Sequence, residues 1–210
     1  MSKFTKEWQE PRSGIRGLIR PGMPLKHKIE LATRRIEAQI QYLNGALQLL
    51  TQRDKALFSK VVDAYSRHDM QRASVYANEL AELRKMANFM MNAELALERV
   101  ALRLRTVAQV GNVAAVLAPV SKVLQNIRAG VAGIFPGAEH ELSEIGMLLD
   151  EIMIEASQTT GMTPDFEVAS EEAQKILNEA AIVAEQRMKE KFPELPTLRA
   201  PAEEAEQFRE

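Results

Sequence analysis

The chain contains no cysteine among its 210 residues, which excludes disulfides, thiolate metal sites and a cysteine nucleophile. Aromatic residues make up only 5% of it, while Ala, Leu, Glu, Arg, Gln and Met are frequent, and this mixture favours helices over sheets. No secretory signal is evident, and the longest apolar run, residues 110–120, is interrupted by Gly111, Asn112 and Pro119. We therefore expect an all-α protein of the reducing cytoplasm without a membrane-spanning segment.

Charge is divided unequally along the chain, although the net charge is only −2. Residues 1–138 contain 21 Lys and Arg against 11 Asp and Glu, whereas residues 139–210 contain 6 against 18. Such asymmetry predicts either a polyanionic partner for the basic half or a clasp between the two halves of the molecule.

Residues able to carry catalytic or metal chemistry are isolated from one another. His27, His68 and His140 lack the Glu-x-x-His spacing of di-metal helical bundles. Ser121 and Ser143 lie in no Ser-His-carboxylate pattern. We expect no enzymatic activity, no cofactor, no metal ion and no small-molecule substrate.

The N-terminal segment, residues 1–20, has the composition of an amphipathic membrane-surface helix. Its candidate membrane-binding residues are Phe4, Trp8, Arg12, Ile15, Arg16, Leu18, Ile19 and Arg20. Its glycines weaken that helix, so a disordered tail with a few apolar residues is the alternative.

Two long amphipathic helices follow. Apolar residues spaced by three and four predict a helix from about Leu25 to Ser66, and a second helix after Asp69, its N-cap, until Gly111 or Pro119. Joined by a short turn, they are expected to form an antiparallel hairpin. A basic ridge borders the packing face of the first helix, formed by Lys28, Arg35, Arg53 and Lys60. The cluster of Arg99, Arg103 and Arg105 is interpreted as a solvated face of the second helix.

Shorter elements complete the chain. We expect a short helix at residues 120–128, a glycine hinge at 130–138 and acidic regulatory helices within 139–191, at about 139–157 and 170–191. The second acidic helix would start at Ser170 in a weak capping box. The hinge residues are Gly130, Gly133 and Gly137, and no Gly-Lys-Ser/Thr follows them, so a nucleotide site is not expected.

The tail, residues 192–210, begins with Phe192-Pro193-Glu194-Leu195-Pro196. Prolines at this spacing hold an extended backbone that presents Phe192 and Leu195 to a groove. On the motif alone, the alternative is a helix terminator followed by a solvated tail.

In the order of these elements, the chain resembles the ESCRT-III family, specifically the archaeal cell-division proteins of the CdvB type. The resemblance covers nearly the whole chain. It rests on the lead-in Arg-Pro-Gly-Met-Pro-Leu at 20–25, the long basic hairpin 21–129 with its short third helix, the acidic helices from 139 and the unit at 192–196.

Membership implies a subunit that forms filaments with itself and with other ESCRT-III-like subunits on the anionic inner face of the cell membrane. It would constrict and cut the neck at midcell in cytokinesis. The residues Phe192, Pro193, Leu195 and Pro196 match the family's motif for binding the MIT domain of an AAA ATPase, which would disassemble the filament. The chain ends soon after this motif, without room for the C-terminal winged helix of longer members, so recruitment by another family member is expected.

The charge division suggests a switch. In a closed form the acidic helices would cover the basic hairpin, and opening at the hinge would expose the hairpin to lipid and to other subunits. One alternative is a soluble coiled-coil scaffold or adaptor without membrane activity. A second, a helical protein that binds nucleic acid through its basic half, is disfavoured because aromatic platforms and a recognition fold are lacking.

Overall fold

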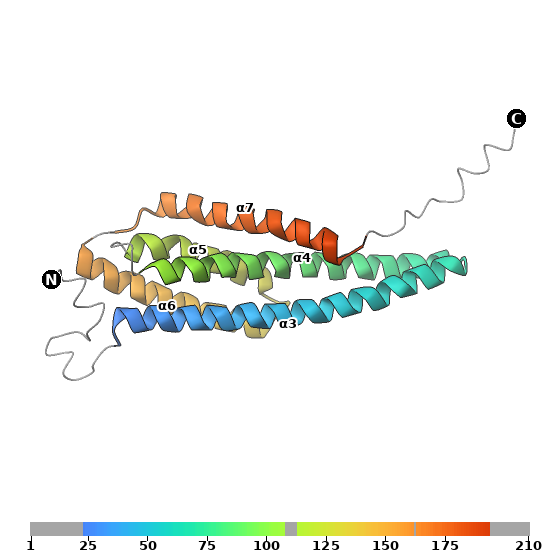
Figure 1. Ribbon diagram of the computed structural model, residues 1–210, viewed down its shortest axis with the longest axis horizontal. Coiled ribbons are helices and arrows are strands. Elements are labelled where there is room, and N and C mark those ends of the chain that lie inside the picture. Colours follow the sequence, from blue (N-terminus) through green and yellow to red (C-terminus); the bar gives the residue numbers. More distant parts are fainter. Residues whose placement is uncertain (1–22, 108–112, 162, 194–210) are drawn as a thin grey trace, which may run out of the picture.

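The computed structural model describes residues 23–107, 113–161 and 163–193, and within these ranges the protein is all-α, as predicted. The helices are α3 (Leu25–Ser66), α4 (Met70–Thr106), α5 (Val113–Val131), α6 (Pro136–Thr160) and α7 (Phe166–Lys191). They lie side by side in an elongated bundle, each antiparallel to the one before it (Figure 1).

The hairpin of α3 and α4 is confirmed, including both bounds of its first helix and the N-cap of its second. The side chain of Asp69 accepts a hydrogen bond from the backbone N–H of Arg72 at 3.1 Å, which satisfies one of the donors left free at a helix start. His68, in the turn, has a φ of 58°, a left-handed conformation that reverses the chain between the helices.

The apolar seam of α3 is buried as its spacing predicts. Its buried residues are Leu25, Ile29, Ala32, Thr33, Ile36, Ile40, Leu43, Leu47, Leu50, Asp54, Leu57, Val61 and Ala64. One core joins α3 and α4 to the three later helices, and a smaller cluster of Leu57, Val61 and Leu80 closes the hairpin near its turn. The turn end of the hairpin projects beyond α6 and α7 (Figure 1).

The second helix was predicted to end at Gly111 or at Pro119, and of these two positions the structure excludes Pro119, because α4 ends at Thr106. Pro119 lies inside α5, which runs from Val113 to Val131 instead of 120–128. A proline inside a helix costs about 3 kcal/mol, but twelve of the nineteen residues of α5 are buried. Packing therefore outweighs the local preference.

The acidic helices are longer than predicted. Helix α6 extends three residues at each end beyond 139–157. Helix α7 starts at Phe166, because Asp165 is its N-cap and accepts hydrogen bonds from the N–H groups of Glu167 and Val168. Ser170 is not the cap: its hydroxyl donates to the carbonyl of Phe166 within the helix, at 2.9 Å.

The connection between α5 and α6 is shorter than the predicted hinge, because it covers only residues 132–135. Gly133 lies in this turn with a φ of 78°, a conformation that other residues rarely adopt. Gly130 belongs to α5, where a Cβ would overlap the ring of Phe89, and Gly137 belongs to α6. Motion about this segment stays a prediction.

Candidate functional site: the interface between the hairpin and the acidic helices

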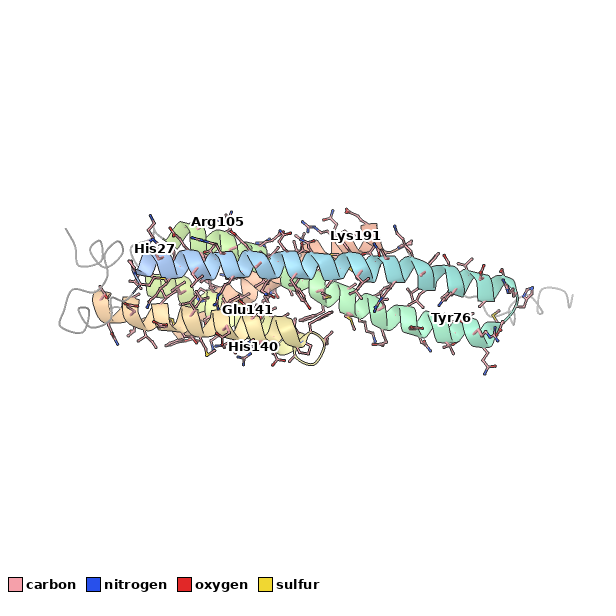
Figure 2. The ribbon with its side chains drawn as sticks, turned by 90° about the horizontal axis from the view of Figure 1, so that it is seen from below. His27, Tyr76, Arg105, His140, Glu141 and Lys191 are labelled. Atoms are coloured by element: carbon pink, nitrogen blue, oxygen red, sulfur yellow. The ribbon has the colours of Figure 1, made fainter. Side chains whose placement is uncertain are left out.

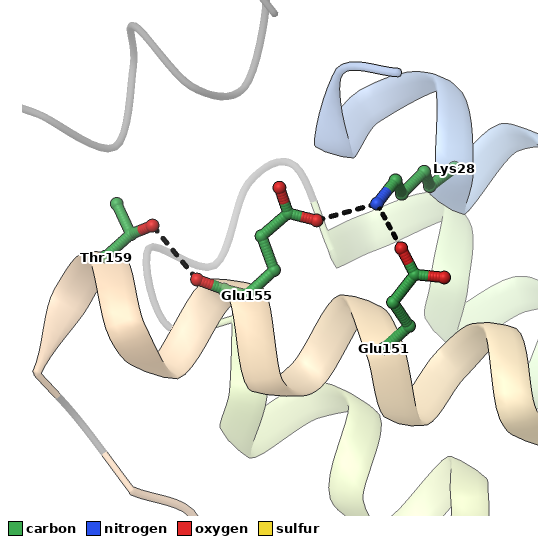
Figure 3. A network of polar contacts seen from close by, with 4 residues as sticks. All are labelled: Lys28, Glu151, Glu155 and Thr159. Atoms are coloured by element: carbon green, nitrogen blue, oxygen red, sulfur yellow. Dashed lines mark hydrogen bonds and ion pairs between the residues drawn. The ribbon is translucent and has the colours of Figure 1, made fainter. Parts of the chain in front are cut away.

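The acidic helix α6 is attached to the basic helix α3 through Lys28. Its ammonium group donates to Oε1 of Glu151 at 2.6 Å and to Oε2 of Glu155 at 2.8 Å (Figure 3). The backbone carbonyl of Glu155 accepts a further hydrogen bond from the hydroxyl of Thr159 at 3.0 Å. The side chains of Lys28 and Glu155 are each only 12% exposed, so this pair is largely shielded from water and salt, whereas the side chain of Glu151 is exposed.

The environment of Lys28 favours its charged form. Burial by itself lowers the pKa of this ammonium, but the hydrogen bonds to Glu151 and Glu155 and the charges of both carboxylates outweigh it. The pKa of Lys28 is therefore raised above its ordinary value of 10.5. The ion pair is present throughout the neutral range.

The predicted basic ridge divides into two parts. Arg35 lies 3.8 Å from Glu141, so α6 covers the ridge as far as Arg35. Arg53 and Lys60 lie farther along α3, toward the turn, where Lys60 lies 5.7 Å from the ring centroid of Tyr76. Figure 2 shows α6 beside only the first part of α3, with Tyr76 in the uncovered part of the hairpin.

The interpretation of the arginine cluster of α4 as a solvated face is wrong for Arg99 and Arg103, whereas Arg105 is exposed. Arg103 pairs with Glu172, and Arg99 with Glu179, both on α7. These two pairs place α7 antiparallel along α4. Arg105 instead bonds Glu37 of α3 at 2.5 Å and so joins the two arms of the hairpin.

Glu94 of α4 is buried near the last turns of α7. It is 4% exposed, and burial, together with the neighbouring charge of Glu98, raises its pKa above the ordinary 4.5. The cations Arg187 and Lys191 of α7 and a hydrogen bond with Asn44 of α3 act in the opposite direction but do not cancel the rise. No pattern in the sequence indicated that this carboxyl would be buried.

Beyond α7, Phe192 packs back onto the hairpin. Its ring is 5% exposed, belongs to the main core and lies 5.9 Å from the guanidinium carbon of Arg84. Arg84 in turn bonds the buried carboxylate of Asp54 on α3, from Nε to Oδ1 at 2.6 Å. Asp54 interrupts the apolar seam of α3, which could have marked it as a paired buried acid. Its partner, thirty residues away, could not be inferred.

The other predicted site residues are placed as follows. Pro193 is exposed, whereas Leu195, Pro196 and the eight candidate membrane-binding residues of the N-terminal segment lie outside the described residues. Among the helices within the described ranges, none combines the length and apolarity needed to cross a bilayer. Those ranges also hold no group of three or more residues that could ligate a metal ion.

Comparison with known proteins identifies relatives among archaeal cell-division proteins. The chain is 39% identical over 198 residues to Cell division protein B1 of Sulfolobus acidocaldarius, covering 93% of this chain and 92% of that protein. It is 36% identical over 162 residues to Cell division protein B of the same organism, covering 77% of this chain and 62% of that protein. No family model and no solved structure matches the chain. The identity over most of its length shows that the chain belongs to the CdvB-type ESCRT-III family of archaeal cell-division proteins.

Proposed function

We propose that this protein is a filament-forming subunit that remodels and cuts membrane in archaeal cell division, and that the structure represents its closed state. One observation carries the proposal: acidic α6 and α7 lie on the basic hairpin and pair with four of its cations. Carboxylates on these two helices pair with Lys28, Arg35, Arg99 and Arg103. The similarity to Cell division protein B1 supports the setting in cell division.

Release of α6 and α7 would leave these four cations available to anionic lipid headgroups. Each basic residue near such a surface contributes about 1 kcal/mol to binding, and added salt screens that contribution. The N-terminal segment would add apolar burial, which salt does not screen. We place the active form on the inner face of the cell membrane at the division site.

A face of α3 is suited to contact between subunits. Residues 38–52 include no charged side chain, although 27% of the whole chain is charged. Tyr42, Gly45 and Leu49 share one side of this stretch, and the side chains of Tyr42 and Leu49 are 47% and 50% exposed. Gly45 has nothing within 4 Å of where a Cβ would be, so a neighbouring helix could approach closely. The occupant we propose is a second copy of this chain.

The tail unit beginning at Phe192 would bind the MIT domain of an AAA ATPase, which removes subunits and so disassembles the filament. Its chemistry suits this role, because an extended proline segment with apolar residues docks in a groove at low entropic cost.

Charge reversal on α7 tests the closed state. The variant Glu172→Lys/Glu179→Lys repels Arg103 and Arg99, so we expect α7 to lift and binding to anionic vesicles to rise several-fold. The control Glu171→Lys/Glu190→Lys changes two exposed carboxylates of the same helix. Co-sedimentation is measured with vesicles of zwitterionic lipid, with and without anionic lipid, and filaments are sought by electron microscopy.

The two double variants carry equal net charge, so equal binding by both would show that charge alone attracts the lipid and would contradict the closed state. Discrete dimers without filaments on anionic vesicles would favour the soluble scaffold instead.

The α3 face has its own test. Leu49→Glu should prevent filaments without unfolding the monomer, because this residue is half-exposed, and Val75→Glu on α4 is the matched control. Gly45→Ala should stabilise the monomer by about 0.5–1 kcal/mol and yet weaken assembly. Normal filaments from both α3 variants would exclude this face as the contact.

A further inference from the structure

Phe192 has one contact in the structure and one proposed above, and the two cannot coexist. In the structure its ring is 5% exposed and packed into the core that joins α7 to the hairpin. In the tail unit the same ring is the first apolar side chain offered to a partner's groove. A ring buried against the hairpin cannot enter that groove.

The contact has a defined construction. Pro193 disfavours helical geometry at the residue before it, and Phe192 is accordingly extended, with φ −121° and ψ 98°. The backbone N–H of Phe192 still donates to the carbonyl of Met188 at 2.9 Å, so the residue is tied to the last turn of α7. Helix α7 therefore ends with the aromatic ring held against α4.

The receiving surface on the hairpin is held in place by an ion pair. The guanidinium of Arg84 faces the ring of Phe192, and its hydrogen bond to the buried Asp54 holds the guanidinium in this position. A planar guanidinium can stack on an aromatic ring while remaining bonded to a carboxylate, which a lysine ammonium does less well.

We infer that the hairpin carries an acceptor site for the tail, formed by Arg84 and Asp54, and that Phe192 occupies it whenever α7 is closed. The inference rests on the proposed binding of the tail to an ATPase domain. The hairpin and that domain compete for one ring, so a closed subunit is hidden from the ATPase. Only a subunit whose α7 end has lifted is open to disassembly.

Reversible cross-linking tests the competition on the full chain. Because the sequence has no cysteine, Arg99→Cys/Glu179→Cys carries only two thiols, at partly exposed positions that face each other across α4 and α7. A bismaleimide linker with an internal disulfide would hold α7 closed. The probe is the isolated MIT domain of the organism's cell-division AAA ATPase, measured by fluorescence anisotropy.

We expect the cross-linked chain to bind the domain at least about tenfold more weakly than a synthetic peptide of residues 186–210, since affinity falls with the fraction of open molecules. Cleavage of the linker with reductant should restore binding. Equal affinity of the cross-linked chain and the peptide would overturn the inference alone. A peptide that fails to bind would overturn the proposed ATPase docking, and the inference with it.

A second variant isolates the ring contact. Arg84→Lys keeps a positive charge beside Asp54 but loses the planar group, so we expect about a two- to fivefold gain in affinity for the domain. Arg72→Lys, an exposed arginine near the turn, is the control. Hydrogen exchange of residues 188–192 should accelerate in Arg84→Lys without the domain present. Unchanged exchange and unchanged affinity would show that Arg84 does not hold the ring.

Discussion

Arg84 donates two hydrogen bonds to the carboxylate of Asp54, from Nε to Oδ1 at 2.6 Å and from Nη2 to Oδ2 at 3.2 Å. Asp54 is 1% exposed, so its carboxylate is held in the seam between α3 and α4 by the guanidinium of Arg84. The pair therefore joins the two arms of the hairpin at the level where α7 ends. The seam can close there because Arg84 compensates the buried charge of Asp54.

Removal of one partner should cost more than removal of both. Arg84→Met leaves a buried carboxylate unpaired, and we expect a loss of about 3–5 kcal/mol in the free energy of unfolding. Asp54→Leu/Arg84→Met should regain most of it, because an apolar pair can pack in the same seam. Urea unfolding of both variants measures the difference. If Arg84→Met were as stable as the wild type, the pair would not support the hairpin.

Lys28 predicts an alkaline sensitivity of the closed state. Its pKa is raised in the folded protein, so the stabilisation is complete below pH 10.5 and is lost as the pH rises through the folded pKa. Lys28→Met should lower the free energy of unfolding by about 1.5–3 kcal/mol at neutral pH, the range for hydrogen bonds to charged groups.

The difference between Lys28→Met and the wild type should shrink once the pH passes the raised pKa of Lys28. Lys55→Met, an exposed change on the same helix, is the control. A gap between Lys28→Met and the wild type that stays constant in alkali would contradict the assignment.

Glu94 predicts a loss of stability that begins in the acidic range. Its pKa is raised by burial, so its favourable contribution is complete below pH 4.5 and is lost as the pH rises through the folded pKa. At neutral pH the charged Glu94 destabilises the closed protein, and Glu94→Gln should raise its melting temperature. This gain should disappear on acidification below pH 4.5. Glu79→Gln, at an exposed carboxylate elsewhere on α4, should not show the same profile.

Local patterns predicted the hairpin well because its helices are specified by residues close together in the sequence. The spacing of Ile29, Ile36 and Leu43 defines the seam of α3. Asp69 caps the next helix by accepting a hydrogen bond from a residue only three positions away. The contacts of Arg99 and Phe192 were missed, since they depend on the register of α7 against α4, eighty or more residues away along the chain.

Local rules also failed where packing opposes them. Pro119 was one of two positions at which the second helix was expected to end, but it lies inside α5, where burial overrides its local preference. Ser170 was expected to start α7, but Asp165, five residues earlier, is the N-cap and accepts hydrogen bonds from the N–H groups of Glu167 and Val168. Charge asymmetry predicted a general contact between the two halves of the chain, but not the specific pair of Arg103 and Glu172.

Gly130 and Gly146 offer a matched test of whether the glycines near the α5–α6 connection serve packing or motion. A Cβ on Gly130 would overlap the ring of Phe89 on α4, whereas one on Gly146 would meet nothing within 4 Å. Gly130→Ala should therefore cost about 1–3 kcal/mol, as overpacking does. Gly146→Ala, inside α6, should gain about 0.5–1 kcal/mol.

Thermal unfolding separates these outcomes, since each kcal/mol shifts the melting temperature of a chain this size by about 2–4 °C. The double variant Gly130→Ala/Phe89→Ala removes the overlapping ring, so the alanine at position 130 should cost less in that background than in the wild type. If Gly130→Ala were instead neutral alone and yet changed vesicle binding, the role of Gly130 would be in opening, because steric overlap in the closed state would then be excluded.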